Sequence, residues 1–400
     1  MGVIGWHIGG GFGFFSKMFG TGAANMLEAT VVTSQGEVVT ASEFQNPDLF
    51  YALRGGGYGF GVVISLTVRT HPLPAVIGHF YMRIRSKSRL GMEELSARFL
   101  HLYRDTVLGP MWGRQVDIRK VSTITDEYRF AVSMLTLLTY SEMVETWLPL
   151  LSWAQANPDE YSVESLSARD FPGQTFWDIS RDSPNQKPTP YDPKEPNRAF
   201  AWNGNLGEIS SYWMAYASRW LQNDQFLKDP TAGAKILLDL AEGAGYAQLH
   251  LSKAQNGAPQ WAIDELDKTP MHPSIKNSFG LWIGDYRVDH FSPLVSNMAQ
   301  YNTSGVRGWL MSCKTDSVDD CDMSAFYQAV NQFREVTPGS GAYFNEADYN
   351  EPDWQNTFWG KDNYRRLLDI KNRWDPEELF YCHNCVGSET WQEGGMCKKS

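Results

Sequence analysis

The chain has 400 residues, a length that predicts two or three domains, and its 42% hydrophobic and 20% charged residues are typical of a folded protein. With 35 Lys and Arg against 46 Asp and Glu, the net charge of -11 argues against a nucleic-acid partner. No run of about 18 apolar residues occurs, so we expect no membrane-spanning segment. The 15 Trp, 18 Tyr and 21 Phe favour pockets for flat or apolar ligands as well as a large core.

The first seventy residues are rich in glycine and favour short strands. Residues 27–33 and 37–41 are expected to form two strands around the turn SQG. A short helix over 46–53 should follow, with Asn46 as its cap and a proline at its first position. A third strand, over 62–70, should end at the segment HPLP.

A second region, residues 75–338, alternates expected strands with expected helices. This order is typical of an α+β domain in which helices cover one face of an antiparallel sheet. The expected strands are 76–84, 129–138, 246–252 and 279–286. The expected helices are 91–105, 141–155, 231–243 and 291–301. Residues 157–197 are polar and rich in proline, and we expect them to form a long irregular loop, such as a lid or a binding loop.

The last region, residues 339–400, contains the polar segment YFNEADY, for which we expect a strand with Tyr343 and Asn345 on one face and Glu346 on the other. A tyrosine or a glutamate beside a redox cofactor can act as a base. The alternative is a polar strand end with ordinary hydrogen bonds. A helix is expected over 363–374, where apolar residues recur at helical spacing.

The cysteines all lie in the last quarter of the chain, and their odd number leaves at least one thiol free or paired with another chain. They are Cys313, Cys321, Cys382, Cys385 and Cys397. The CHNC motif formed by Cys382 to Cys385 fits a redox pair, a metal site or a disulfide. Zinc needs four ligands, and the βαβ setting of a thioredoxin-like site is missing, so we favour a structural or buried pair. The eight His show no metal-binding spacing, so we predict no metal site. Separately, Asn302 begins a glycosylation sequon.

Two glycine clusters flank the first expected hairpin. The first contains Gly9, Gly10, Gly11 and Gly13 and follows His7, and the second is the segment RGGGYGFG. Such clusters allow backbone amides to approach a phosphate, a ring edge or an oxyanion closely. The spacing is neither that of a dinucleotide-binding fingerprint nor that of a P-loop, and the G-x-S-x-G motif of a hydrolase is absent from the sequence. The clusters therefore suggest one shared ligand, with tight turns in packed β structure as the alternative.

Longer segments resemble a known family. Residues 5–42 (GWHIGGGFG to VVTAS) and 46–74 (NPDLFYALRGGGYGFGVV to THPLP) resemble the FAD-binding domain of vanillyl-alcohol-oxidase-type flavoproteins. Residues 343–391 (YFNEADY to CVGSETW) resemble the C-terminal segment of berberine-bridge-enzyme-like proteins. The combination is most similar to fungal FAD-linked oxidases.

The resemblance implies an α+β chain in three parts. Residues 1–74 would be the C-terminal half of a PCMH-type FAD-binding domain, 75–338 a substrate domain with an antiparallel sheet flanked by helices, and 339–400 a segment that folds back onto the FAD domain. It also implies an oxidoreductase of secondary metabolism with FAD as cofactor. A small substrate, aromatic or polyketide-like, would pass hydride to flavin N5, and O2 would reoxidise the flavin.

The resemblance also assigns site residues. Those expected to contact FAD are His7, Gly9, Gly10, Gly11, Gly13, Asn25, Leu27, Glu28, Gly61, Val62, Val63 and Asn345. Asn25 stands where an Asp is common. Tyr343 and Asn345 match the family's Y-x-N-Y strand beside the flavin ring, in which the second tyrosine is often the proposed base. Glu346 occupies that position here, and we expect Glu346 and Tyr343 to be the catalytic residues, since a buried carboxylate can do the work of a base.

The family's FAD domain normally begins much earlier, and its diphosphate loop and covalent flavin attachments belong to that earlier part. Three interpretations follow: a piece of a working flavin oxidase, a short form that acts as a flavin-free cyclase or partner protein, or a chain that folds only with a separate N-terminal FAD subdomain. The localisation is left open, and would be secretory if a full-length form has a signal peptide.

Overall fold

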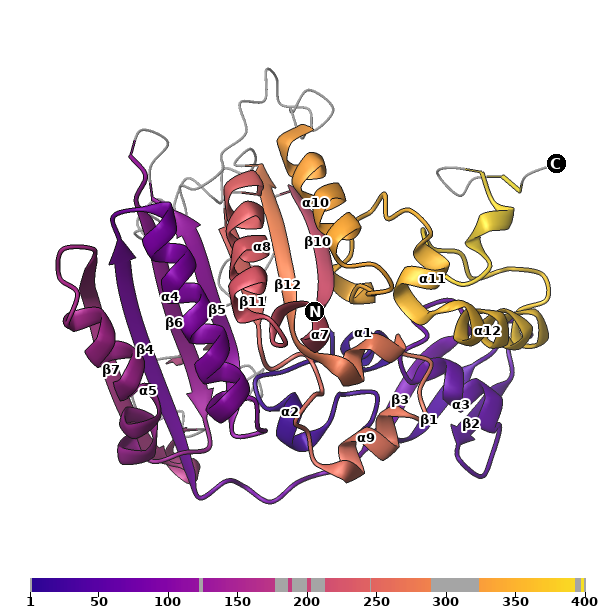
Figure 1. The fold of residues 1–400 in the computed structure, drawn as a ribbon. Coiled ribbons are helices and arrows are strands. Elements are labelled where there is room, and N and C mark those ends of the chain that lie inside the picture. Colours follow the sequence, from indigo (N-terminus) through magenta and orange to yellow (C-terminus); the bar gives the residue numbers. More distant parts are fainter. Residues whose placement is uncertain are drawn as a thin grey trace.

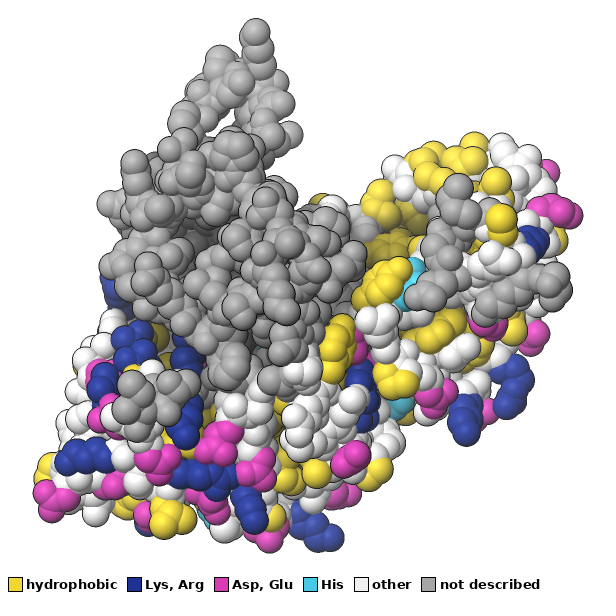
Figure 2. All heavy atoms as spheres, turned by 90° about the horizontal axis from the view of Figure 1, so that it is seen from above, with side chains coloured by type: hydrophobic (Ala, Val, Ile, Leu, Met, Phe, Trp, Pro, Cys, Tyr) yellow, Lys and Arg dark blue, Asp and Glu magenta, His cyan; other side chains and the backbone are white. Residues whose placement is uncertain are grey.

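The computed structural model describes residues 2–121, 125–176, 186–188, 200–202, 213–244, 246–288, 324–392 and 397–398. Within these residues the chain forms two larger antiparallel sheets and a two-stranded one, β8 (Gln186–Pro188) with β9 (Phe200–Trp202), and the C-terminal helices α11 (Trp354–Trp359) and α12 (Lys361–Trp374) lie beside the smaller of the two larger sheets (Figure 1). Within the described part of the chain, no helix is long and apolar enough to cross a membrane. The face drawn in Figure 2 shows basic and acidic side chains interspersed among the coloured residues.

The first sheet is small and has the strand order β2-β1-β3. Its elements and the helices around it are α1 (Val3–Ile8), α2 (Ser16–Phe19), β1 (Met26–Val32), β2 (Val38–Ser42), α3 (Pro47–Leu53) and β3 (Val62–Val68). These strands and α3 agree with the sequence predictions within two residues at each end. The predicted cap is wrong, because Asn46 has left-handed backbone angles and its side chain donates to the carbonyl of Thr40 at 2.7 Å instead.

The second sheet has seven strands in the order β10-β12-β11-β5-β6-β4-β7, and every neighbouring pair is antiparallel. The strands are β4 (Val76–Ser86), β5 (Trp112–Lys120), β6 (Tyr128–Thr136), β7 (Tyr161–Pro172), β10 (Trp213–Gln222), β11 (Tyr246–His250) and β12 (Ser278–Val288). Alternate side chains, such as Phe80, Met82 and Ile84 of β4, are buried in the main core. The α+β class predicted from the sequence is confirmed.

Helices cover the buried face of this sheet (Figure 1). They are α4 (Arg89–Leu102), which continues as the π-helix Tyr103–Val107, α5 (Tyr140–Gln155), α8 (Pro230–Gly243) and α10 (Ser324–Val336). Side-chain caps start the first three: Ser88 and Asp229 accept backbone hydrogen bonds, and Thr139 forms a capping box with Glu142. The remaining short elements of this part are α6 (Gly173–Phe176), β8 (Gln186–Pro188), β9 (Phe200–Trp202) and α7 (Asn223–Phe226).

The prediction of an irregular loop over 157–197 is wrong at its start, where β7 pairs with β4 over its full length. The segment is polar because β7 is the edge strand and much of it is exposed to solvent. The expected helix 291–301, the sequon at Asn302 and the two cysteines Cys313 and Cys321 lie outside the described residues.

Residues 251–277 leave the second sheet between β11 and β12 and lie against the first part of the chain. They contain α9 (Gln260–Leu266) and the 3-10 helix Pro273–Asn277. Glu265 of α9 accepts a hydrogen bond from the buried Arg54 at 2.8 Å, and Arg54 also donates to the carbonyl of Ala23 at 2.9 Å. Because of this excursion, the division at residues 74 and 338 stays a proposal.

The C-terminal segment packs its helices on α3. Its elements are the 3-10 helix Phe344–Glu346, α11 (Trp354–Trp359), α12 (Lys361–Trp374) and the 3-10 helix Ser388–Thr390. Leu367 and Ile370 of α12 join the core of the first sheet. The helix predicted over 363–374 is confirmed, but the strand predicted for YFNEADY is wrong, since the residues after Tyr343 form a helical turn.

Candidate functional site

Tyr343 lies where the two ends of the sequence and the second sheet meet. Its side chain is 4% exposed, and its ring packs edge-on against that of Phe12, with 4.8 Å between centroids. The phenolic oxygen accepts hydrogen bonds from the Gly11 amide at 3.3 Å and from Asn345 Nδ2 at 3.0 Å. The backbone amide of Tyr343 donates to Ser218 Oγ of β10 at 3.0 Å. This bond and the one from the Trp220 amide to the carbonyl of Gly341, at 2.9 Å, fix the segment to β10 of the second sheet.

The Tyr343 hydroxyl stays protonated over the physiological range. Burial is the main cause that raises its pKa, and the carboxylate of Glu346 adds to the effect. Within the described part of the chain the hydroxyl accepts two hydrogen bonds and donates none, so its own hydrogen remains available. The group is thus an oriented donor rather than a base in its resting state.

Asn345 joins the two glycine clusters. Its amide lies so close to Gly9 that a Cβ built there would be 2.2 Å from Asn345 Oδ1. Its Oδ1 accepts a hydrogen bond from the Tyr58 hydroxyl at 3.0 Å, and Tyr58 belongs to the second cluster. A Cβ at Gly57 would be 2.9 Å from the ring of Phe344. Both glycine clusters therefore contact the segment that starts at Tyr343. This arrangement is what a single ligand site shared by the two clusters would need.

Glu346 is held by an ion pair that the sequence analysis did not predict. Lys253 Nζ lies 2.6 Å and 2.5 Å from the two carboxylate oxygens of Glu346, and 5.7 Å from the centroid of the Tyr343 ring. Lys253 is buried and comes from the segment that follows β11. The sequence contains no signal for this pair, because Lys253 belongs to a segment without a motif. Tyr58 could have been proposed as a site residue from the sequence, because it lies inside the second glycine cluster.

A line of polar side chains extends from this ion pair across the face of the second sheet that is opposite to the helices. His250 Nε2 lies 2.7 Å from Gln248 Oε1, and Gln248 Nε2 donates to Asp117 Oδ1 at 3.0 Å. Burial, with the charges of Lys253 and Arg114 as smaller causes, lowers the pKa of His250 well below its usual value, so the imidazole is neutral. Burial raises the pKa of Asp117. These polar groups give this face of the sheet both donors and acceptors, and His250 lies near enough to Lys253 for its charge to act on the imidazole.

The amides of the first glycine cluster have hydrogen-bond partners inside the protein, and their contact with a ligand stays a prediction. The amides of Gly9 and Gly10 donate to the carbonyls of Gly5 and His7, and that of Gly13 donates to Ser16 Oγ at 2.7 Å. His7 is likewise bonded locally, with its Nδ1 2.8 Å from the carbonyl of Val3. In this structure the glycines serve close packing.

The remaining predicted contacts form a second group on the first sheet. In the register of β1 with β3, Val31 pairs with Val63 and Val32 with Val62, directly after Gly61. Val63 is buried in the core, whereas Leu27, Glu28 and Val62 are exposed. Asn25 holds the turn before β1: its Nδ2 donates to the carbonyls of Phe19 and Thr21, and its Oδ1 lies 2.7 Å from His71 Nε2.

Comparison with solved structures identifies the fold. The VAO-type flavoprotein MtVAO713 from Myceliophthora thermophila matches 100% of this chain with a TM-score of 0.68 at 22% identity, and the match covers 64% of that protein. A glucooligosaccharide oxidase from Acremonium strictum matches 97% of this chain with a TM-score of 0.65 at 18% identity, over 71% of that protein. The chain therefore has the VAO-type fold.

The sequence comparisons narrow the class. Residues 342–387 match the family model described as berberine and berberine-like. Two fungal proteins named FAD-linked oxidoreductase, ZEB1 from Gibberella zeae and ffsJ from Aspergillus flavipes, are each 28% identical over 99% and 96% of this chain. The resemblance found in the sequence is confirmed: the C-terminal segment is similar to berberine-like proteins, nearly the whole chain is similar to fungal FAD-linked oxidoreductases, and these relatives support FAD as the cofactor. The chain spans 60% and 58% of the length of these two relatives.

Proposed function

We propose that this chain forms the substrate side of an FAD-dependent oxidoreductase that oxidises a small organic molecule, aromatic or polyketide-like, with O2 as the final electron acceptor. The observation that supports the proposal most strongly is the meeting of Tyr343, Asn345 and the Lys253–Glu346 pair with both glycine clusters. Bound FAD would supply the acceptor for a hydride at N5. The fungal relatives and the aromatic content of the chain support the substrate class.

The residues fit the ring end of FAD. An isoalloxazine edge offers oxygen and nitrogen acceptors, and the site offers the hydroxyl hydrogen of Tyr343, whose direction is set by the bonds from Asn345 and Gly11. Exposed Leu27, Glu28 and Val62 would face the adenine end, next to Gly61 and Val63. The amides of the first glycine cluster are already bonded, so we assign them no diphosphate contact.

Glu346 would accept the proton that the substrate loses as it is oxidised. Its carboxylate is half-buried, and the ion pair with Lys253 fixes its position beside the ring of Tyr343. Tyr343 would donate a hydrogen bond that orients the substrate or the flavin edge. The polar line through His250, Gln248 and Asp117 would bind polar groups of the substrate and keep them in register with Glu346.

The test starts from the absorption spectrum of the purified 400-residue protein before and after acid precipitation. A flavin spectrum that is released by acid would support non-covalent FAD binding. Glu346→Gln should then slow flavin reduction by substrate by about 100-fold or more while leaving FAD bound, as the loss of a general base does. The matched control is Asp362→Asn, on the exposed surface of α12, and unchanged reduction in Glu346→Gln would remove the proposed role.

A flavin-free role, as a cyclase or as a partner of another chain, is the second candidate. The bonded amides of the first glycine cluster and the close contact of Asn345 with Gly9 favour it, since a packed segment lies where a ligand was expected. A folded but colourless protein that takes up no added FAD would support this candidate and exclude oxidase activity of the chain alone.

A further inference from the structure

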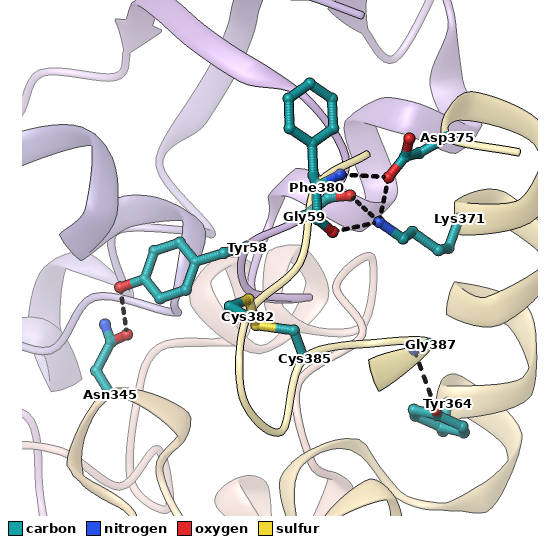
Figure 3. The surroundings of a disulfide bond; sticks show 10 residues. All are labelled: Tyr58, Gly59, Asn345, Tyr364, Lys371, Asp375, Phe380, Cys382, Cys385 and Gly387. Carbon is teal, nitrogen blue, oxygen red and sulfur yellow. Dashed lines mark hydrogen bonds and ion pairs between the residues drawn. A yellow bond between two sulfur atoms is a disulfide. The ribbon is translucent and has the colours of Figure 1, made fainter. Parts of the chain in front are cut away.

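The CHNC motif forms a closed turn that the proposed function does not use. Cys382 and Cys385 are joined by a disulfide in the loop between α12 and the last 3-10 helix (Figure 3). The two sulfur-bearing residues differ in access: Cys382 is partly exposed, whereas Cys385 is 3% exposed. An incoming thiol therefore meets Cys382 first.

The two residues inside the turn are anchored to one neighbour. His383 Nε2 lies 2.7 Å from the carbonyl oxygen of Tyr349, and Asn384 Nδ2 donates to the same oxygen at 2.9 Å. The His383 ring stacks on the Tyr349 ring with 3.7 Å between centroids. These contacts fix the two inner residues of the turn, whereas the disulfide fixes its two ends. A bond that closes so short a ring also constrains the unfolded chain little, so the fold does not depend on it.

A short chain of bonds links the turn to the candidate site (Figure 3). Lys371 Nζ donates to the carbonyl of Phe380, two residues before Cys382, at 2.8 Å, and to the carbonyl of Gly59 at 2.7 Å. Gly59 follows Tyr58, whose hydroxyl donates to Asn345 Oδ1 at 3.0 Å. The conformation of the loop before Cys382 therefore affects the position of the second glycine cluster.

We propose that the Cys382–Cys385 disulfide is a thiol-exchange site for small thiols of the glutathione type, and that its opening loosens the second glycine cluster. An incoming thiolate forms a bond to Cys382 Sγ, the Cys382–Cys385 bond breaks, and Cys385 leaves as a thiolate that takes up a proton. A second thiol then attacks the mixed disulfide, releasing Cys382 as a thiol. In total, two thiols are oxidised to one disulfide and the protein disulfide is reduced to two thiols.

The first experiment tests which sulfur is attacked. Both variants also contain Cys397→Ser, because Cys397 is an exposed free thiol. In Cys385→Ser, oxidised glutathione should form a mixed disulfide at Cys382, located by peptide mass spectrometry. In the matched Cys382→Ser, modification of the buried Cys385 should be at least 10-fold slower. Equal rates at the two positions, or no adduct at Cys382 in the folded variant, would overturn the proposal.

The second experiment uses the unchanged chain and needs no flavin or substrate, so its result is independent of the proposed oxidoreductase activity. In glutathione buffers of increasing reducing strength, the disulfide should open while the far-ultraviolet circular dichroism stays constant. Amide hydrogen exchange of residues 55–61 should become at least several-fold faster on opening. A disulfide that opens only when the chain unfolds, or one whose opening leaves exchange in 55–61 unchanged, would refute the proposal even if the variants do not fold.

Discussion

The amide of Gly11 donates a hydrogen bond to the phenolic oxygen of Tyr343 at 3.3 Å, although 332 residues separate them in the sequence. This bond and the one from Asn345 occupy the acceptor positions of a side chain that is almost fully buried. The candidate site thus depends on contact between the first and last parts of the chain. Its residues can be tested through stability as well as through chemistry.

Tyr343→Phe should destabilise the protein by about 1–3 kcal/mol, because the buried Gly11 amide would lose its acceptor. Urea denaturation followed by Trp fluorescence measures the change. If the protein binds FAD, the same variant should also shift the flavin absorption bands. An unshifted spectrum in a variant that still binds FAD would place Tyr343 away from the ring.

Gly9→Ala should destabilise the protein by about 1–3 kcal/mol, because the new methyl group would overlap the Asn345 side chain. Gly109→Ala is the matched control, since a Cβ there meets no atom within 4 Å, and its stability should stay within about 1 kcal/mol of wild type. Combining Gly9→Ala with Asn345→Ala should recover part of the loss. Equal effects of the two glycine substitutions would contradict the close contact.

Lys371→Met should cost about 3–5 kcal/mol, because it leaves Asp375, which is 0% exposed, as a buried charge without its partner at 2.5 Å. The loss also frees the carbonyls of Gly59 and Phe380. The exposed pair of Arg365 with Asp362 provides the control, and Asp362→Asn should change stability by less than about 0.5 kcal/mol. A small effect of Lys371→Met would contradict the contacts that join α12 to the loop at Gly59.

The stability of the protein should rise between pH 7 and about pH 10 through Lys17. Burial lowers the pKa of Lys17 to about 7, whereas the unfolded chain keeps the ordinary value of 10.5. Between these values the unfolded state binds more protons than the folded state, so the free energy of unfolding increases with pH by at most about 1.4 kcal/mol per unit. Below pH 7 both states bind the proton and the full cost of burying the charge remains.

Lys17→Met should abolish this contribution, so the stability difference between wild type and variant should change with pH in that window and be constant below it. Guanidinium denaturation at a series of pH values measures the difference. Lys235→Met, on the exposed surface of α8, serves as the control. A difference that does not depend on pH would show that the Lys17 ammonium is not desolvated beside Tyr103, to which it donates at 3.0 Å.

Much of the fold could be predicted because local patterns and tertiary structure agree. The alternating burial pattern of β4 and the proline at the first position of α3 predict a strand and a helix start, and the structure has both. Prediction failed where tertiary context decides. β7 is polar because it is an edge strand, and Asn46 does not cap α3 because its side chain bonds to Thr40.

In the candidate site, too, some residues could be predicted from the sequence and others are determined by tertiary contacts alone. The resemblance placed Tyr343, Asn345 and the first glycine cluster in one site, and the structure brings them together. It could not indicate Lys253, because the ion pair with Glu346 joins residues 93 apart through a loop that has no motif. The FAD contacts and the catalytic roles stay predictions until a flavin spectrum and the Glu346 variant are measured.

The path of residues 251–277 also determines how the protein can be divided. This segment leaves the seven-stranded sheet, supplies Lys253 and Glu265 to the other part of the molecule, and returns as β12. A fragment that ends near residue 74 would keep Arg54 but lose its carboxylate partner. No single cut in the sequence therefore yields two self-contained pieces. A chimera of two relatives should take α9 and the first 74 residues from the same parent, even though α9 lies between β11 and β12 in the sequence.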